Sequence, residues 1–140
     1  MNLDRGTKIY TAVLAGLLLT GLLGWLLTHD RRLGEIDEML YQDPEIAAYP
    51  YRFRVLEIRG TTAIVSTPRS ASMPAVKFLA LIKPGLIHKS EQDPEVMEAQ
   101  QELATLQGKV RKQILRRDDI DAVSWRLDKR WYAEKGILAE

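Results

Sequence analysis

The chain has 140 residues, with no cysteine and only two histidines, His29 and His88. The absence of cysteine excludes disulfide bridges, thiolate metal ligands and lipid attachment through a thiol. It suits an oxidising compartment without requiring one. Two histidines with no H-E-x-x-H spacing offer no zinc motif, so we expect no histidine-based metal site.

Motifs that support catalysis are also missing. The sequence contains no G-x-S-x-G nucleophile motif, no phosphate-binding P-loop and no G-x-G-x-x-G turn. Asp118, Asp119 and Asp121 raise a metal-site hypothesis, but acids this close together are more often a solvated turn between a helix and a strand. We therefore expect no catalytic residues, no metal and no cofactor.

A long stretch without charge lies near the N-terminus. Residues 9–27, IYTAVLAGLLLTGLLGWLL, contain no Asp, Glu, Lys or Arg. As a helix they would be about 28 Å long, close to the roughly 30 Å hydrocarbon thickness of a bilayer. Tyr10 and Trp25 stand near the two ends, where aromatic side chains prefer the headgroup level. No small-residue cleavage site follows, so we predict an uncleaved transmembrane helix at 9–27 after a tail at 1–8.

Small side chains recur at every fourth position of this segment. They are Ala12, Gly16, Thr20 and Gly24, called the small-residue row below. Residues with this spacing share one face of a helix. In lipid, helices associate by close backbone packing, which small residues on one face permit. We predict that the small-residue row packs against another membrane helix; the alternative is chance composition, because small residues are common in such helices.

The two flanks of the hydrophobic segment carry nearly equal basic charge. Arg5 and Lys8 precede it, and Arg31 and Arg32 follow it. The positive-inside rule therefore separates the two orientations only weakly. Because the N-terminal tail is short and basic, we expect a cytoplasmic N-terminus and an external C-terminal domain. In a Gram-negative bacterium this is an inner-membrane anchor with a periplasmic domain.

From residue 28 onward, acids and bases balance overall but are sorted into blocks. Acids dominate 30–45 and 91–102, while bases dominate 52–89 and 109–117. Nucleic-acid binding requires a positive surface that the rest of the domain does not neutralise. The overall balance therefore makes nucleic acid an unsuitable partner.

The basic block at 52–89 still contains candidate docking residues. Arg52 and Arg54 alternate with aromatic residues close to the predicted anchor, so anionic headgroups are one candidate ligand. Arg69 lies in the loop PRSASMP, residues 68–74, and exposed loops often carry binding residues. We predict docking or headgroup contact at Arg52, Arg54 and Arg69; the alternatives are neutralisation within the domain and an ordinary exposed connector.

The remaining sequence predicts an α+β domain at 51–140, preceded by a juxtamembrane helix and connector at 28–50. The predicted strands cover 51–58, 62–67, 75–82 and 123–127, with a bulge near Val55, and the last predicted helix covers 129–138. The expected fold is an N-terminal single transmembrane helix followed by a small antiparallel-sheet domain with one long helix packed on it.

The long helix has the clearest signals. Asp93 is a good N-cap, Pro94 suits the first helical position and Glu95 suits the first turn. Apolar residues then recur at helical spacing at Val96, Ala99, Leu103, Leu106, Val110 and Ile114. Acids in its first half and bases in its second complement the helix dipole. We predict that this apolar stripe packs on the sheet.

Together these features favour a non-catalytic, single-pass accessory or assembly subunit of a membrane protein complex. Its expected partners are the bilayer and an integral membrane protein, which the small-residue row would contact. A second hypothesis is a self-associating envelope binding or sensor module whose anchor forms a homodimer. A third is a membrane-tethered enzyme, which the missing motifs disfavour.

Overall fold

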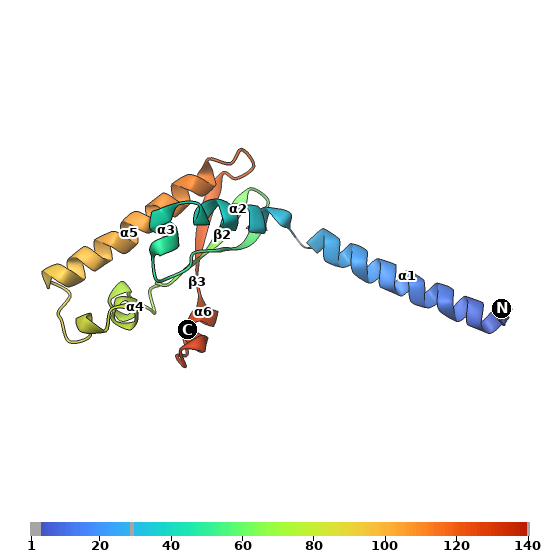
Figure 1. Cartoon of the computed structure of the whole chain (residues 1–140), viewed down its shortest axis with the longest axis horizontal. Helices are drawn as coiled ribbons and strands as arrows, with labels where there is room; N and C mark the ends of the chain where they lie inside the picture. Colours follow the sequence, from blue (N-terminus) through green and yellow to red (C-terminus); the bar gives the residue numbers. More distant parts are fainter. Residues whose placement is uncertain (1–3, 29, 140) are drawn as a thin grey trace. The chain divides into compact units, whose positions relative to one another are not determined.

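The computed structural model describes residues 4–28 and 30–139. The chain divides into two units, one ending at Arg31 and the other beginning at Arg32. The first unit contains α1 (Arg5–Thr28), a continuous helix of 24 residues, drawn in blue in Figure 1. At 1.5 Å per residue, it is about 36 Å long. It includes the predicted segment 9–27 and begins earlier, at Arg5.

The second unit is an α+β domain, as predicted. Its elements are α2 (Arg31–Tyr41), α3 (Pro44–Ala48), β1 (Val55–Arg59), β2 (Thr62–Thr67), α4 (Ala75–Ile82), the 3₁₀ turn η1 (Pro84–Leu86), α5 (Pro94–Leu115), β3 (Ala122–Leu127) and α6 (Lys129–Glu134). The domain begins before the predicted boundary at residue 51, because Ile36 and Leu40 of α2 are fully buried in its core.

The sheet has three strands in the order β1-β2-β3 and is mixed. β1 and β2 are antiparallel, with a register shift between Val55 and Glu57 that confirms the predicted bulge. β2 and β3 are parallel, so the prediction of an antiparallel sheet is wrong for this pair. The physical reason is the connection between them. α4, η1 and α5 form a long crossover, which can return the chain to the starting end of the sheet.

The predicted strand at 75–82 is also wrong, because these residues form α4. An apolar run of eight residues satisfies both a buried strand and a short helix. Phe78 and Leu79 are buried, and Ala75 and Ile82 pack partly buried against the core. Their spacing of three and four residues is helical, and Pro74 and Pro84 bound the run.

β1 begins at Val55, four residues later than the predicted strand at 51–58. Residues 51–54 form no regular strand, and side chains of other segments accept hydrogen bonds from the backbone amides at the start of β1. The amide of Arg54 donates to Ser66 Oγ at 3.0 Å, and the amide of Val55 donates to Asp37 Oδ1 at 2.8 Å. Tyr51 and Phe53 are buried. The segment therefore contributes to the core without forming a regular ladder.

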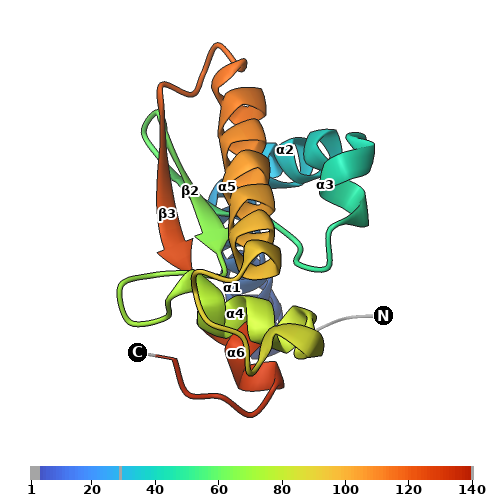
Figure 2. The same ribbon diagram turned by 90° about the vertical axis from the view of Figure 1, so that its left-hand side faces the viewer.

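α5 confirms the predicted long helix. Asp93 caps it, accepting a hydrogen bond from the amide of Glu95 at 2.9 Å, and Pro94 is its first residue. Every residue of the predicted apolar stripe is buried: Val96, Ala99, Leu103, Leu106, Val110 and Ile114. Figure 2 shows α5 running along the strands, with α2 and α3 on its other side. The core lies around α5, between these layers.

Aromatic residues from the segment before β1, from α4 and from α6 pack against one another. Tyr51 contacts Phe78 of α4 and Trp131 of α6 edge to face, at centroid distances of 5.8 and 5.7 Å. Phe78 and Trp131 lie 5.4 Å apart. Aromatic pairs at these distances add to the stabilisation from apolar burial. α4 and α6 are therefore packed together at one end of the sheet (Figure 1).

Candidate functional site

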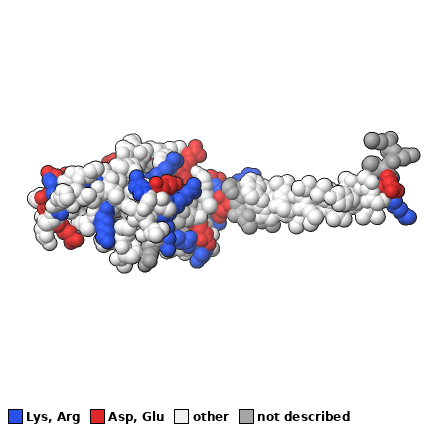
Figure 3. Space-filling model, turned by 90° about the horizontal axis from the view of Figure 1, so that it is seen from below, with Lys and Arg blue, Asp and Glu red and all other residues white. Residues whose placement is uncertain are grey.

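The surface of α1 is apolar over most of its length. Figure 3 shows it white between its charged N-terminal end and the domain. The large side chains of Leu17 and Leu18 are 66% and 68% exposed, and those of Tyr10 and Trp25 are also exposed. Of the helices in the described residues, one is long and apolar enough to cross a membrane, and it includes α1. Length and composition alone support this capacity.

The small-residue row lies along α1 with its backbone accessible. Apart from the adjacent residues and the nearby backbone of α1 itself, no described atom lies within 4 Å of the position that a Cβ would take at Gly16 or Gly24. Thr20 Oγ1 donates to the carbonyl of Gly16 at 2.8 Å, so this hydroxyl is paired inside the helix. A hydroxyl paired in this way can enter an apolar environment at low cost. The row therefore offers a shallow surface at Gly16 and Gly24 on which another helix could pack closely.

The three candidate arginines have different surroundings. The Arg52 guanidinium stacks on the Tyr41 ring, with 3.9 Å between its carbon and the ring centroid. Arg54 Nη2 lies 3.3 Å from Asp128 Oδ1, and its side chain is about one-third exposed. Arg69 Nε donates to Gln107 Oε1 at 2.7 Å. Arg54 is therefore part of the fold's polar network, while Arg52 and Arg69 present charge at the surface.

Asp128 is the centre of a buried polar network that the sequence analysis missed. Its side chain is 6% exposed. Asp128 Oδ2 accepts from the Tyr51 hydroxyl at 2.8 Å, and Oδ1 accepts from the amide of Trp131 at 3.1 Å, capping α6. Burial raises the pKa of Tyr51 well above its ordinary value. Asp128 directly after β3 and three residues before Trp131 is an N-cap signal that could have been found.

The loop at 68–74 is fixed at both ends. Met73 is buried, and its amide and that of Ser70 bond across the loop to each other's carbonyls. The Tyr132 hydroxyl donates to the carbonyl of Pro68. The residues predicted to form a loop do so, and the side chain of Arg69 extends from this loop to Gln107 of α5. Arg69 is therefore held in place by a structured loop.

A small basic cavity of about 280 Å³ lies where this loop meets α5 and β3. Its lining residues include Arg69, Gln107, Arg111 and Trp125, and no acid is among them. Gln107 is 6% exposed, and its amide donates to Thr67 Oγ1 at 2.7 Å while its oxygen accepts from Arg69. This buried amide fixes one guanidinium at the cavity. The two arginines can attract an anionic group.

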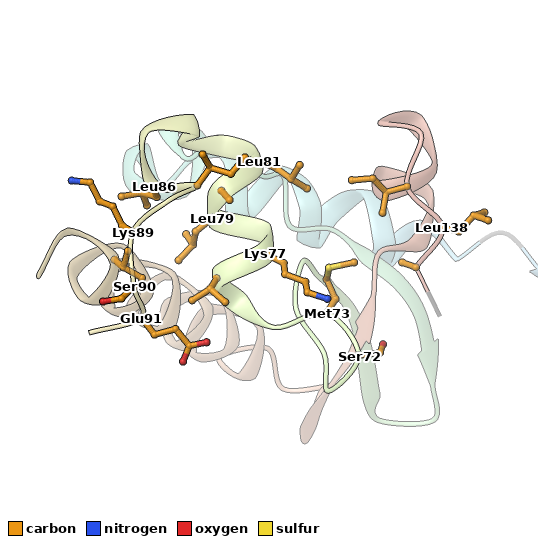
Figure 4. A pocket seen from close by; sticks show the side chains of 16 residues that line it. Ser72, Met73, Lys77, Leu79, Leu81, Leu86, Lys89, Ser90, Glu91 and Leu138 are labelled. Carbon is orange, nitrogen blue, oxygen red and sulfur yellow. The ribbon is translucent and has the colours of Figure 1, made fainter. Parts of the chain in front are cut away.

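A larger apolar cavity of about 840 Å³ lies between α4, η1, the start of α5 and the C-terminal residues. Figure 4 shows the side chains of Leu79, Leu81 and Leu86 in its wall and Leu138 on the opposite side. Leu138 is 95% exposed and Ile87 62% exposed. Lys77, Lys89 and Glu91 supply the charged part of the lining. The cavity therefore forms an uncovered apolar surface on the domain.

A third cavity, of about 570 Å³, lies between α3 and α5 beside Tyr49. Tyr49 is 8% exposed, and its hydroxyl has no hydrogen-bond partner among the residues that the structure describes. Burial, followed by the nearby charge of Glu102, raises the pKa of Tyr49 to about 12. The hydroxyl is therefore neutral at physiological pH and contributes no charge to this cavity.

The acids considered as a metal site are not brought together as ligands. Asp119 accepts from Arg117 Nε at 3.0 Å and lies 3.4 Å from Arg32 Nη1. These guanidinium groups, Arg117 first, hold the pKa of Asp119 below its usual value. Within residues 4–28 and 30–139, no group of three or more His, Cys, Asp and Glu side chains is placed to hold a metal ion. His88 is exposed, and His29 lies outside the described residues.

Ion pairs connect the charge blocks of the domain. Lys109 Nζ lies 2.9 Å from Asp43 and 3.1 Å from Glu45, which joins α5 to α3. Lys83 pairs with Glu102 at 3.2 Å. Figure 3 shows both signs mixed over the visible face of the domain. Part of each basic block, 52–89 and 109–117, is therefore neutralised within the domain, whereas Arg111, beside the small basic cavity, has no carboxylate partner among the described residues.

Comparison of the chain with protein-family models, with curated proteins and with solved structures finds no match. The assignment of a function therefore depends on the residues and geometry described above.

Proposed function

We propose that this chain is a non-catalytic, single-pass accessory or assembly subunit of a membrane protein complex. In this proposal α1 spans the membrane, docks on an integral membrane partner through the small-residue row, and anchors an external α+β domain. The observation that carries the proposal is a long apolar helix whose small residues share one accessible face. Large apolar side chains exposed along the rest of α1 suit contact with acyl chains.

The domain supports a docking role in two ways. The cavity between α4 and the C-terminal residues leaves apolar side chains uncovered, and exposed apolar patches commonly mark interaction surfaces. Arg69 is held by Gln107 next to Arg111 at the small basic cavity, where it can pair with an acidic group of the partner. Arg52 remains a candidate for headgroup contact because its charge is exposed.

The proposed location is the inner membrane of a bacterium, with the N-terminus in the cytoplasm and the domain in the periplasm. The basic residues Arg5 and Lys8 before the apolar segment support this orientation, although Arg31 and Arg32 follow it. A reporter fused at the C-terminus tests it. Activity of a periplasm-dependent reporter is expected, and activity of a cytoplasm-dependent reporter would reverse the assignment.

The docking proposal is tested by replacing Gly16 and Gly24 with leucine and measuring co-purification from membranes. Leucine side chains would hold the partner helix away from the backbone, so loss of the partner is expected. Gly21→Leu is the matched control, because it makes the same change in α1 outside the row. Retention of the partner by the double variant, or equal loss in Gly21→Leu, would contradict docking through this face.

Self-association of the anchor is the second candidate, because the small-residue row would also suit a helix homodimer. A transmembrane dimerisation assay separates the two functions. The accessory-subunit proposal predicts weak self-association of α1. Strong self-association that Gly16→Leu abolishes would favour an envelope binding or sensor module.

A further inference from the structure

β3 is an edge strand with a regular, open side. It pairs with β2 alone in the order β1-β2-β3, and its register is continuous from Ala122 to Leu127. Its sequence, AVSWRL, contains neither proline nor glycine. Native proteins usually protect sheet edges with bulges, prolines or charges. β1, at the other edge, has such a bulge between Val55 and Glu57, whereas the register of β3 shows none.

The hydrogen bonds of β3 show which backbone groups face outward. The amide of Asp128 donates to the carbonyl of Thr67 at 2.9 Å, and at the start of the strand the carbonyl of Thr61 accepts from the amides of both Asp121 and Ala122. With Ala122 paired to Thr62 and Leu127 to Thr67, the register assigns Ala122, Ser124 and Arg126 as the residues bonded to β2. Because pairing alternates along a parallel strand, the amides and carbonyls of Val123, Trp125 and Leu127 point away from β2. Among the described residues, no strand lies on that side to pair with them.

The charge on β3 does not protect its edge. Arg126 is the one charged residue in the strand, and its Nη2 lies 3.4 Å from Glu57 Oε2 on β1. This contact directs the guanidinium back over the sheet. The open edge therefore lacks the outward charge that commonly prevents an additional strand from pairing.

The small basic cavity lies on the α5 side of the same edge. Trp125 lines it together with Arg69 and Arg111. Val123, Trp125 and Leu127 are half-buried and alternate with exposed residues, so their side chains occupy the α5 face of the sheet. A strand added beside β3 would also place alternate side chains on this face. Those side chains would lie beside two arginines, with no acid in the cavity lining to compete for them.

We propose that the open edge of β3 and the small basic cavity, with Arg69 and Arg111, bind an extended acidic segment of the partner protein. The segment adds a fourth strand to the sheet by pairing with the backbone of Val123, Trp125 and Leu127. An Asp or Glu carboxylate on its α5 face enters the basic cavity and provides specificity. The identity of the occupant as the partner rests on the function proposed above, while the binding site itself does not.

A second copy of the chain is a poorer occupant of this site. An antiparallel pairing of two β3 strands about their middle would place Trp125 of both copies close to the twofold axis. The arginines beside each tryptophan would then converge without an intervening acid. Like charges brought together in this way disfavour pairing.

The experiment presents displayed random peptides of about ten residues, long enough to pair along β3, to the full-length chain in lipid nanodiscs. Peptides that alternate Asp or Glu with β-branched residues are expected to be enriched. A synthetic copy of an enriched peptide should bind the double variant Arg69→Gln/Arg111→Gln about tenfold more weakly. Lys112→Gln, which removes a charge from α5 outside the cavity, is the matched control and should bind normally.

The backbone contribution is tested separately. Val123→Pro removes an outward amide and leaves the amides that pair with β2, so it should reduce peptide binding while Val123→Thr retains it. A peptide methylated on alternate amides should also fail to bind the unchanged protein, which gives a test that does not depend on a variant folding. Enrichment of no peptide, or peptide binding that survives both the arginine substitutions and amide methylation, would overturn the proposal.

Two further outcomes distinguish this inference from the proposed function. Dimers of the unchanged chain that Val123→Pro converts to monomers would assign the edge to a second copy and overturn the acidic-segment proposal. Peptide binding that remains intact in Gly16→Leu/Gly24→Leu would support the β3 site, whether or not the membrane partner is retained. Failure of docking through α1 and failure of the β3 site are therefore observed in different assays.

Discussion

Replacing Asp128 with alanine should destabilise the domain more than any single contact of Asp128 would suggest, because one buried carboxylate serves three groups. It caps α6 through the amide of Trp131, accepts from the Tyr51 hydroxyl and pairs with Arg54. Loss of an N-cap costs about 1 kcal/mol. A buried hydroxyl donor that loses its acceptor costs roughly 1–3 kcal/mol. The ion pair with the partly exposed Arg54 contributes at most about 1 kcal/mol.

The expected loss in free energy of unfolding is therefore about 2–5 kcal/mol. In a domain of this size it corresponds to a fall in melting temperature of roughly 10–20 °C. Denaturation of the full-length chain in micelles, followed by near-ultraviolet circular dichroism, measures it. Asp128→Asn should cost less, because an asparagine oxygen can still cap α6.

Tyr51→Phe provides the internal control for this prediction. It removes the hydroxyl that Asp128→Ala would leave without its carboxylate acceptor, so the double variant should be more stable than the sum of the single effects predicts. The expected coupling is about 1 kcal/mol or more. A loss below about 1 kcal/mol in Asp128→Ala, or strict additivity of the two substitutions, would refute the assignment of Asp128 as the centre of the network.

Three other substitutions have clear expected outcomes. Tyr49→Phe removes a buried hydroxyl without a described partner, so a thermal melt should show unchanged or slightly higher stability, by up to about 1 kcal/mol; a marked loss would reveal a bond to that hydroxyl. Gly60 has a φ of +59° in the β1–β2 turn, so Gly60→Ala should cost about 1 kcal/mol by denaturant titration, and equal stability would contradict this backbone assignment. Lys109 and the other donors around Asp43 lower the pKa of that carboxyl in the folded domain. The stabilisation from ionised Asp43 is therefore fully present above its ordinary pKa near 4, and it is lost as the pH falls through the lower pKa of the folded state. The difference in melting temperature between the unchanged chain and Asp43→Asn, which retains the cap of α3, should therefore shrink below about pH 4, and a difference independent of pH would argue against the ion pair.

Local signals in the sequence were sufficient for some elements. β2 matches the predicted strand at 62–67 because its β-branched residues favour a strand and Gly60 supplies the turn before it. α5 was predictable because Asp93, Pro94 and a long apolar stripe all indicate the same helix. The bulge near Val55 was predictable because the apolar alternation changes phase there.

Other features depend on contacts between distant residues. By composition, the run at 75–82 fits a strand or a helix. In the structure it forms a helix that buries Phe78 and Leu79 in the core. The parallel pairing of β3 with β2 follows from the long connection between them, which contains α4, η1 and α5. The surroundings of Arg54 and Arg69 could not be predicted either, because Asp128 and Gln107 lie far away in the sequence. The basic cavity beside Trp125 exists only once α5 lies along the sheet.

The most direct test of the proposal that this chain is an accessory or assembly subunit is the mass of the particle that contains it after detergent-free extraction from its native membrane. Native mass spectrometry of that particle should show a complex with at least one different integral membrane protein. A particle that contains this chain alone with lipid, or only copies of it, would contradict the assignment.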